Sequence, residues 1–208
     1  MSRKPGSVPE ETRAKLIASA TEEFHRCGFE SASLRRICAN AGVTTGAMYF
    51  FFKNKDELFE AVISPAMERV IAVISDHFRK EQETIAYNPM LDDSEDIHAG
   101  ELILTTYFAN KDLFEIILCN REHPLVVGFF DRMTAMCDAQ TIAIATGNGV
   151  AVGENSRFNE ATVHWFSHLE IDTIIHVITH NSSEEKAKKQ LAVMMRFMEG
   201  GFLALIQE

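Results

Sequence analysis

The residues best suited to chemistry lie between positions 33 and 55, and the chemistry they suit is contact with nucleic acid. Thr44 follows the turn-forming Gly42 and can cap a short helix, which leaves the first backbone amides of that helix pointing outward. The helix dipole favours a phosphate group at such an end. Gly46 has no side chain, so another molecule can approach the backbone closely. Together these residues predict a helix end that faces DNA.

Four neighbouring side chains add the contacts that such a helix end needs. Thr45 and Ala47 carry methyl groups that can contact the methyl group of thymine. Tyr49 can offer its hydroxyl to a phosphate. Lys55 falls in the first turn of the next helix, where a cation is unfavourable for the dipole, so a phosphate partner explains its position better than helix stability does.

These side chains must be held by two short helices and a tight turn. A helix over about residues 34–40 is capped by Ser33, and Gly42 permits the turn that follows. The second helix runs over residues 44–51, and Asn54 begins a third one. This layout presents one helix end to the major groove of DNA.

The stretch from Phe29 to Phe59 resembles the TetR family of bacterial transcriptional regulators. The family pattern is present here as Ala41-Gly42-Val43-Thr44-Thr45-Gly46-Ala47-Met48-Tyr49 and then Phe52-Lys53-Asn54-Lys55-Asp56-Glu57-Leu58. The match covers about 50 residues and is specific, whereas beyond it only chain length and helical character fit. The resemblance implies DNA-binding roles for Ser33, Thr44, Thr45, Gly46, Tyr49 and Lys55.

One departure from the family pattern affects how bases are read. Family members often carry His, Tyr or Arg where this chain has Phe50 and Phe51, which donate no hydrogen bonds. We therefore expect Arg35 and Arg36 to carry more of the polar contact with DNA, and DNA shape to contribute to specificity. Phe50 is included among the expected DNA contacts. The alternative is that Phe50 or Phe51 packs inside the domain.

Charge is divided unevenly along the 208 residues, whose net charge is −10. Residues 1–55 carry a net charge of +4, and residues 56–208 carry −14. Phosphate affinity needs local positive charge, and an acidic body disfavours DNA contact elsewhere. This division predicts a DNA-binding domain over residues 1–55 and a helical ligand-binding and dimerisation domain over residues 56–208.

Hydrophobic periodicity predicts an all-α fold, with an N-terminal three-helix domain containing a helix-turn-helix and a larger helical body. We see no convincing strands. The expected helices cover about residues 8–26, 34–40, 44–51, 55–82, 97–110, 111–121, 124–146, 157–180 and 184–206. Pro65 could kink or split the fourth of these. Residues 147–156 hold three glycines and read as a loop.

Several classes of protein are disfavoured by what the sequence lacks. No run approaches the roughly 18 apolar residues of a membrane helix, and no secretory signal is seen. The four cysteines are far apart, which is typical of a reducing cytosol, so we expect a cytoplasmic protein without a membrane partner. No phosphate-binding glycine loop, nucleophile elbow or HExxH motif is present, so an enzyme is not expected.

The last two helices are the expected homodimer interface. Residues 184–206 are apolar nearly all round, so they must be buried on most faces, and Gly200-Gly201 permits close backbone approach. A dimer is expected because one such domain contacts too little DNA for tight specific binding. The family typically dimerises through a C-terminal helix pair. An internal core helix is the alternative.

A histidine-rich stripe runs along residues 157–180 at steps of four: His164, His168, Asp172, His176 and His180. Three interpretations stay open. The stripe is a polar seam beside the dimer interface, the polar wall of a ligand pocket, or a metal site of His164, His168 and Asp172. We assign no metal ligands and no cofactor.

The resemblance also implies a pocket for an unknown small-molecule effector among the helices of the body. Its expected lining is Tyr107, Phe108, Phe129, Met133, His164 and His168. Aromatic and Met residues at helical spacing equally suit a plain core.

The function that follows is a DNA-binding transcriptional regulator, a repressor released from a palindromic operator by the effector. The alternative is a DNA-binding protein controlled by a protein partner or by no ligand. A pocket in the body would favour the first interpretation, and a filled core the second.

Overall fold

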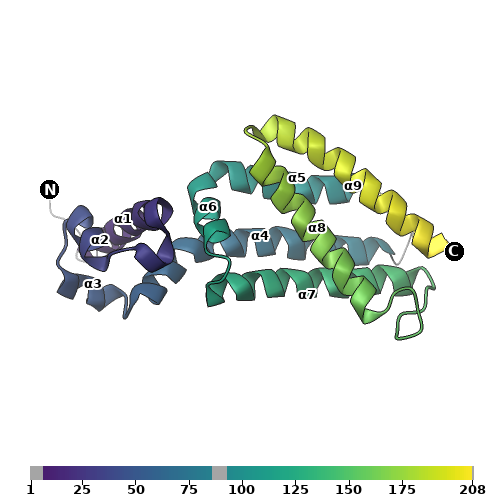
Figure 1. Ribbon diagram of the computed structural model, residues 1–208, viewed down its shortest axis with the longest axis horizontal. Coiled ribbons are helices and arrows are strands. Elements are labelled where there is room, and N and C mark those ends of the chain that lie inside the picture. The colour runs from purple at the N-terminus through teal and green to yellow at the C-terminus, as the bar shows by residue number, and fades with distance from the viewer. Residues whose placement is uncertain (1–6, 86–92, 208) are drawn as a thin grey trace. The chain divides into compact units, whose positions relative to one another are not determined.

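The computed structural model describes residues 7–85 and 93–207. The all-α prediction is confirmed, since within these residues the chain forms helices and only one isolated β-bridge, between Val152 and Phe158. The helices are α1 Ser7–Ser31, α2 Leu34–Ala41, α3 Thr45–Phe51, α4 Lys55–Ile85, α5 Asp93–Ala109, α6 Lys111–Cys119, α7 Pro124–Gly147, α8 Glu160–His180 and α9 Glu184–Gln207 (Figure 1). No described helix is long and apolar enough to span a bilayer.

Local signals in the sequence account for several helix ends. Gly28 has φ 72° and ψ 170°, which interrupts the helical path inside α1. Asn54 Oδ1 accepts a hydrogen bond from the Glu57 backbone N–H at 2.8 Å, which confirms the expected cap of α4. The α4 helix continues through Pro65, so this proline does not split it.

The chain divides into two compact units, and both are discontinuous in sequence. Unit 1 comprises Met1–Glu68 and Asn110–Val127, and unit 2 comprises Arg69–Ala109 and Gly128–Glu208. Unit 1 therefore contains the expected DNA-binding domain together with the start of α4 and the whole of α6. The chain passes between the units within α4 and α7 and at the junction of α5 with α6.

An aromatic cluster forms the core of unit 1. The ring of Phe59 on α4 lies 5.0 Å from that of Phe24 and 4.9 Å from that of Phe29, measured between centroids. The His123 ring lies 4.4 Å from Phe29 and 4.6 Å from Phe59. Such aromatic contacts bury large apolar areas. Through His123, these contacts pack the segment after α6 against α1 and α4.

Unit 2 is a helical bundle in which α5 packs closely on α9. At Gly100 on α5, an added Cβ would lie only 2.7 Å from Cδ2 of Leu191 on α9. A side chain at this position would require Leu191 to shift, so Gly100 permits the close approach of α5 and α9. Where α8 meets α9, Phe158 and Phe166 pack on Phe202, with the ring centroids of each pair 5.5 Å apart.

Candidate nucleic-acid interface and ligand cavity

The turn between α2 and α3 is built from the expected residues. The Ser33 hydroxyl accepts a hydrogen bond from the Arg36 N–H at 3.4 Å and caps α2. Gly42 ends that helix in the left-handed region at φ 69°, which favours glycine. Its N–H donates to the Ala39 carbonyl at 3.1 Å. The chain can then reverse direction into α3.

Helix α3 exposes most of the residues expected to contact DNA. The Thr44 hydroxyl accepts from the Ala47 N–H at 3.1 Å, which confirms the cap. Thr44, Thr45 and Gly46 are exposed, and Ala47 is half-buried. Met48 on the opposite face is fully buried, so the core fixes the orientation of this helix.

The two phenylalanines at the end of α3 differ in their surroundings. Phe50 is 80% exposed, whereas Phe51 is half-buried. Their rings meet edge to face at 5.1 Å. Tyr49 is 53% exposed. Phe50 therefore does not pack inside the domain, and together with Tyr49 it offers an aromatic surface beside the outer face of α3.

Lys55 has contacts that the sequence did not predict. Its Nζ donates to the carbonyls of Phe29 at 2.8 Å and Glu30 at 3.1 Å, and it lies 4.4 Å from the centre of the Phe29 ring. A cation here satisfies carbonyls near the end of α1, where the helix dipole favours positive charge. These contacts account for Lys55 at the start of α4 without a phosphate.

The buried carboxylate of Glu23 joins α1 to the start of α2. Its Oε1 accepts from the Ser33 N–H at 3.0 Å and lies 3.6 Å from Arg36 Nη1, while Oε2 accepts from Arg26. Burial opposes the charged form of Glu23, but these hydrogen bonds and cations outweigh it and lower its pKa. Arg36 therefore has an internal partner, whereas Arg35 is exposed and forms no ion pair with any described residue.

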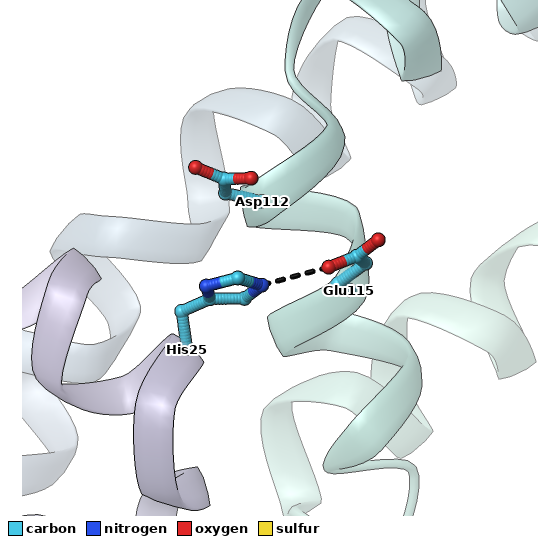
Figure 2. Close-up of side chains that lie close together, drawn as sticks. All are labelled: His25, Asp112 and Glu115. Atoms are coloured by element: carbon cyan, nitrogen blue, oxygen red, sulfur yellow. Dashed lines mark hydrogen bonds and ion pairs between the residues drawn. The ribbon is translucent and has the colours of Figure 1, made fainter.

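A second set of polar contacts connects α1 with α6 and the segment after it. Figure 2 shows the His25 imidazole on α1 pointing to the Glu115 carboxylate on α6, with an Nε2–Oε2 distance of 2.7 Å and Asp112 nearby. Asn120 Oδ1 accepts from the Phe29 N–H at 2.9 Å, just after the Gly28 interruption. Movement of α6 would therefore act directly on α1.

Unit 2 contains a cavity of about 200 Å³ between α4, α5, α7, α8 and α9. Of the six residues expected to line a pocket, Met133 does so. Tyr107 and Phe129 are buried in the core, and Phe108 is half-buried, but none of these three lines the cavity. Helical spacing cannot distinguish core residues from cavity residues, because both face inward.

His164 and His168 are exposed and also lie away from the cavity. His164 Nδ1 is 3.2 Å from Asp138 Oδ2, and the two imidazoles meet with Nε2 atoms 3.1 Å apart. His176 and His180 are likewise exposed, with stacked rings 4.1 Å apart. Within the described chain, the stripe does not gather three metal-ligating atoms at one point. These contacts match the polar-seam interpretation.

Sequence reasoning missed the polar end of the cavity. His77 Nε2 lies 2.7 Å from Asp96 Oδ1 and 3.8 Å from Glu81 Oε2, and Glu170 on α8 lines the same cavity. The signal available in the sequence was the spacing of four between His77 and Glu81 on one helix. Asp96 and Glu170 join them only through tertiary packing.

Comparison with known proteins connects the N-terminal part of the chain to one family. Residues 16–62 match the family model described as bacterial regulatory proteins, tetR family. The HTH-type transcriptional regulator SrpR of Pseudomonas putida is 42% identical over 64 residues, which are 31% of this chain and 30% of SrpR. UidR of Escherichia coli strain K12 is 36% identical over 61 residues, 29% of this chain and 31% of UidR. The matched region thus spans about a third of these relatives' length.

Solved structures extend the likeness to nearly the whole chain. A TetR-like transcriptional regulator from Rhodococcus sp. RHA1 has a TM-score of 0.63 at 17% identity, covering 96% of this chain and 100% of that one. Salmonella enterica GusR has a TM-score of 0.62 at 21% identity, covering 95% and 96%. At these identities the likeness is one of fold.

Proposed function

We propose that this chain, whose residues 16–62 belong to the tetR family of bacterial regulatory proteins, is a dimeric DNA-binding transcriptional regulator that a small molecule releases from its operator. The observation that carries the DNA-binding part is the outer face of α3. A capped helix end at Thr44 and the exposed aromatic pair of Tyr49 and Phe50 stand on a helix whose other face is anchored by Met48.

The DNA-binding set is Ser33, Arg35, Arg36, Thr44, Thr45, Gly46, Ala47, Tyr49 and Phe50. Arg35 is the cation of this set that pairs with no described residue, while Arg36 pairs with Glu23 and Lys55 binds the carbonyls at the end of α1. Arg35 therefore contributes most of the phosphate charge from α2. The residues of this set on α3 contact bases mainly through methyl groups and aromatic rings. Such contacts distinguish bases less sharply than hydrogen bonds do, so DNA shape contributes a large share of the specificity.

Exposed apolar residues on the last two helices support a homodimer through α8 and α9. Val193 is 68% exposed and Phe197 80% exposed, one helical turn apart on α9, and Trp165 on α8 is 57% exposed. Gly200 and Gly201 continue this stretch of α9, and a Cβ there would meet nothing within 4 Å. Large exposed apolar side chains mark interaction sites when they cluster. A second copy that covers them would place two α3 helices on one operator.

The cavity in unit 2 favours control by a small molecule over control by a protein partner alone. It lies between five helices, its walls are mostly apolar, and a few polar groups gather at His77. That combination is typical of ligand sites. Because α4 and α7 each run from one unit into the other, a ligand that repositions them would act on unit 1.

Binding of the purified protein to the DNA upstream of its own gene tests this function. We expect a specific complex with a palindromic segment, two chains per site, and loss of the complex when an effector is added. A scrambled segment of the same length is the control. Equal affinity for the palindrome and the scrambled segment would contradict a sequence-specific regulator.

A further inference from the structure

The cavity of unit 2 is unusual in the charge of its lining. Four carboxyl side chains line it, one each from α4, α5, α8 and α9. No Lys or Arg is among its described lining residues. These carboxyl groups belong to Glu81, Asp96, Glu170 and Glu199. The one basic side chain there is His77. Any ligand in this cavity therefore meets an excess of acidic groups.

Among these acids, the contacts of Glu81, Asp96 and Glu170 include only one basic side chain, His77. His77 Nε2 is shared between Asp96 at 2.7 Å and Glu81 at 3.8 Å, so one imidazole faces two carboxyl groups. Glu81 Oε2 also accepts from Gln140 Nε2 at 2.5 Å, a neutral donor. Glu170 has the Cys137 thiol as its hydrogen-bond partner, and no ion pair within 4 Å joins it to a described residue.

The raised pKa values of Glu81 and Glu170 agree with the scarcity of cationic side chains around them. Burial, reinforced by the neighbouring Asp96, raises the pKa of Glu81 to about 7, and burial with Asp96 does the same for Glu170. A buried carboxyl with no cation beside it holds its proton to higher pH. A bound cation would reverse this effect and release protons.

The remaining walls suit an apolar body. Phe78, Phe166, Phe202, Met195 and Met198 line the cavity. Aromatic faces and thioethers contact organic cations favourably. The volume of about 200 Å³ limits the ligand to a small molecule.

We propose that this cavity binds a small apolar molecule carrying one positive charge, with Glu170 and Glu81 facing the charge and the aromatic and Met side chains around the apolar part. The inference rests on the proposed function in that it names the chemical class of the effector. Carboxylate ligands are disfavoured, because they would lie among like charges.

Titration calorimetry with three eight-carbon probes tests the charge preference directly. Octyltrimethylammonium, octanol and octanoate share an apolar chain and differ in the charge of the head. We expect octyltrimethylammonium to bind once per chain at least tenfold more tightly than octanol, with octanoate weakest. Octanol or octanoate binding as tightly as the cation would overturn the proposal.

Glu170→Gln removes the charge while keeping the shape of the side chain. We expect at least a tenfold loss of cation affinity with octanol binding unchanged. Asp172→Asn is the matched control, since it removes one acid from an exposed position on the same helix and should leave cation affinity within twofold. Glu81→Gln is the second variant should Glu170→Gln fail to fold. Unchanged cation affinity in a folded variant of either glutamate would contradict the site.

Proton release distinguishes binding in the cavity from nonspecific binding of octyltrimethylammonium to the protein surface, because nonspecific binding would release no protons from Glu81 and Glu170. At pH 7 the cation should release a fraction of a proton or more per chain, measured from the heat of binding in buffers of different ionisation enthalpy. Zn²⁺ titrated alone addresses the other cation chemistry here, because His77, Glu81 and Asp96 place ligand atoms within 4.8 Å of one another. Zn²⁺ binding that requires His77 and excludes octyltrimethylammonium would overturn the proposal.

Parallel DNA-binding measurements separate this inference from the proposed function. Cation binding that depends on Glu170 but leaves the DNA complex intact would support the ligand class and refute effector control. Release of DNA by octanoate, without any effect of the cation, would support effector control and refute the ligand class.

Discussion

Phe50 is the residue of α3 whose proposed contact with DNA involves no hydrogen bond. It is 80% exposed next to the capped end of α3, where a buried ring would contribute to stability but could not reach DNA. Its apolar surface suits thymine methyl groups and sugars. The exposed position supports the proposed role of Phe50 in DNA contact, whereas Phe52, which is 2% exposed, belongs to the core.

Replacing Phe50 with Ala should weaken operator binding about tenfold, because a buried Phe ring contributes roughly 1.5–3 kcal/mol. The free energy of unfolding should change by no more than about 0.5 kcal/mol, as for other exposed sites. Phe52→Ala is the contrasting variant and should destabilise the protein by about 3–5 kcal/mol. Fluorescence anisotropy with labelled operator and urea unfolding measure the two effects. Full operator affinity in Phe50→Ala would remove this residue from the interface.

Arg35→Ala should weaken binding to all DNA sequences and flatten its salt dependence, since each lost phosphate contact lowers the slope of log affinity against log salt by about 1. Lys15→Ala removes a cation that is paired with Glu11 on the exposed part of α1, and serves as the control. Measurements over a salt series separate a phosphate contact from a base contact. An unchanged slope for Arg35→Ala would refute its assigned role.

The pKa of Glu170, raised to about 7, also predicts a pH dependence of stability. Because this folded-state pKa lies above the ordinary value of 4.5, the stabilising contribution is full below pH 4.5 and is lost as pH rises through 7. Glu170→Gln should therefore be more stable than the unsubstituted protein at pH 8, by on the order of 1–3 kcal/mol, and similar to it at pH 4.5. The groups facing Glu170 are Cys137, Asp96, Glu81 and His77.

Urea unfolding of the ligand-free protein at both pH values measures this difference. Asp172→Asn is again the control and should show no such pH-dependent gain. Equal stability of Glu170→Gln and the unsubstituted protein at pH 8 would contradict a charged, uncompensated carboxylate in the cavity.

At the scale of elements, the turn at Gly42 determines where α3 lies. The positive φ of 69° lets the chain leave α2 and allows the Val43 N–H to donate to the Cys38 carbonyl at 2.9 Å. A residue with a Cβ resists this conformation. The turn, the Thr44 cap and buried Met48 therefore act together to hold the outer face of α3.

Gly42→Ala should destabilise the protein by roughly 1–2 kcal/mol and reduce operator affinity, because an L-residue is strained in the left-handed region. Gly128→Ala is a control of opposite sign. Gly128 lies inside α7 with open space around its Cα, so the added methyl group should stabilise the helix by about 0.5–1 kcal/mol. Thermal unfolding compares the two. Stabilisation by Gly42→Ala would show that the turn does not require glycine.

The contacts of α6 and of Asn120 directly after it show how an element distant in sequence joins α1 in unit 1. Asn120 holds the Phe29 N–H, and Glu115 pairs with His25. The His25 hydrogen bond lowers the pKa of Glu115, so this pair strengthens once that carboxylate is charged. Neither contact is visible from periodicity, because 90 residues separate His25 from Glu115.

At the scale of the whole molecule, the proposed interface on α9 would link dimer formation to DNA binding. Phe197→Asp should convert the proposed dimer to monomers, because it places a charge in the core of the proposed interface. Operator affinity should fall by at least tenfold, since one DNA-binding unit loses the linked second site. Val152→Asp is the control, with an apolar residue replaced by an acid on an exposed loop. Sedimentation analysis reports the mass, and a dimer that survives Phe197→Asp would relocate the interface.

The uneven distribution of charge between the two parts of the sequence is also a property of the whole molecule. Residues 1–55 have a net charge of +4 and residues 56–208 a net charge of −14. The same acidic excess that disfavours DNA contact outside the N-terminal domain supplies the carboxyl groups of the cavity. A cationic effector would be drawn to the cavity by the acidic excess of residues 56–208, which also disfavours contact of these residues with DNA.

The sequence by itself determined the helices and the turn between α2 and α3. Caps at Ser33, Thr44 and Asn54 and the glycine at position 42 act over a few residues, so their signals are complete in the local sequence. The predicted order of helices was correct for the same reason.

Only the tertiary structure decided which inward-facing residues line the cavity and which pack in the core. Met133 lines the cavity while Tyr107 and Phe129 are core, and Lys55 turns to the carbonyls of Phe29 and Glu30. The acidic cavity also arises from tertiary structure, since it joins residues 77, 81, 96 and 170. Periodicity reports which face of a helix is buried, whereas the partners on that face depend on how distant helices pack.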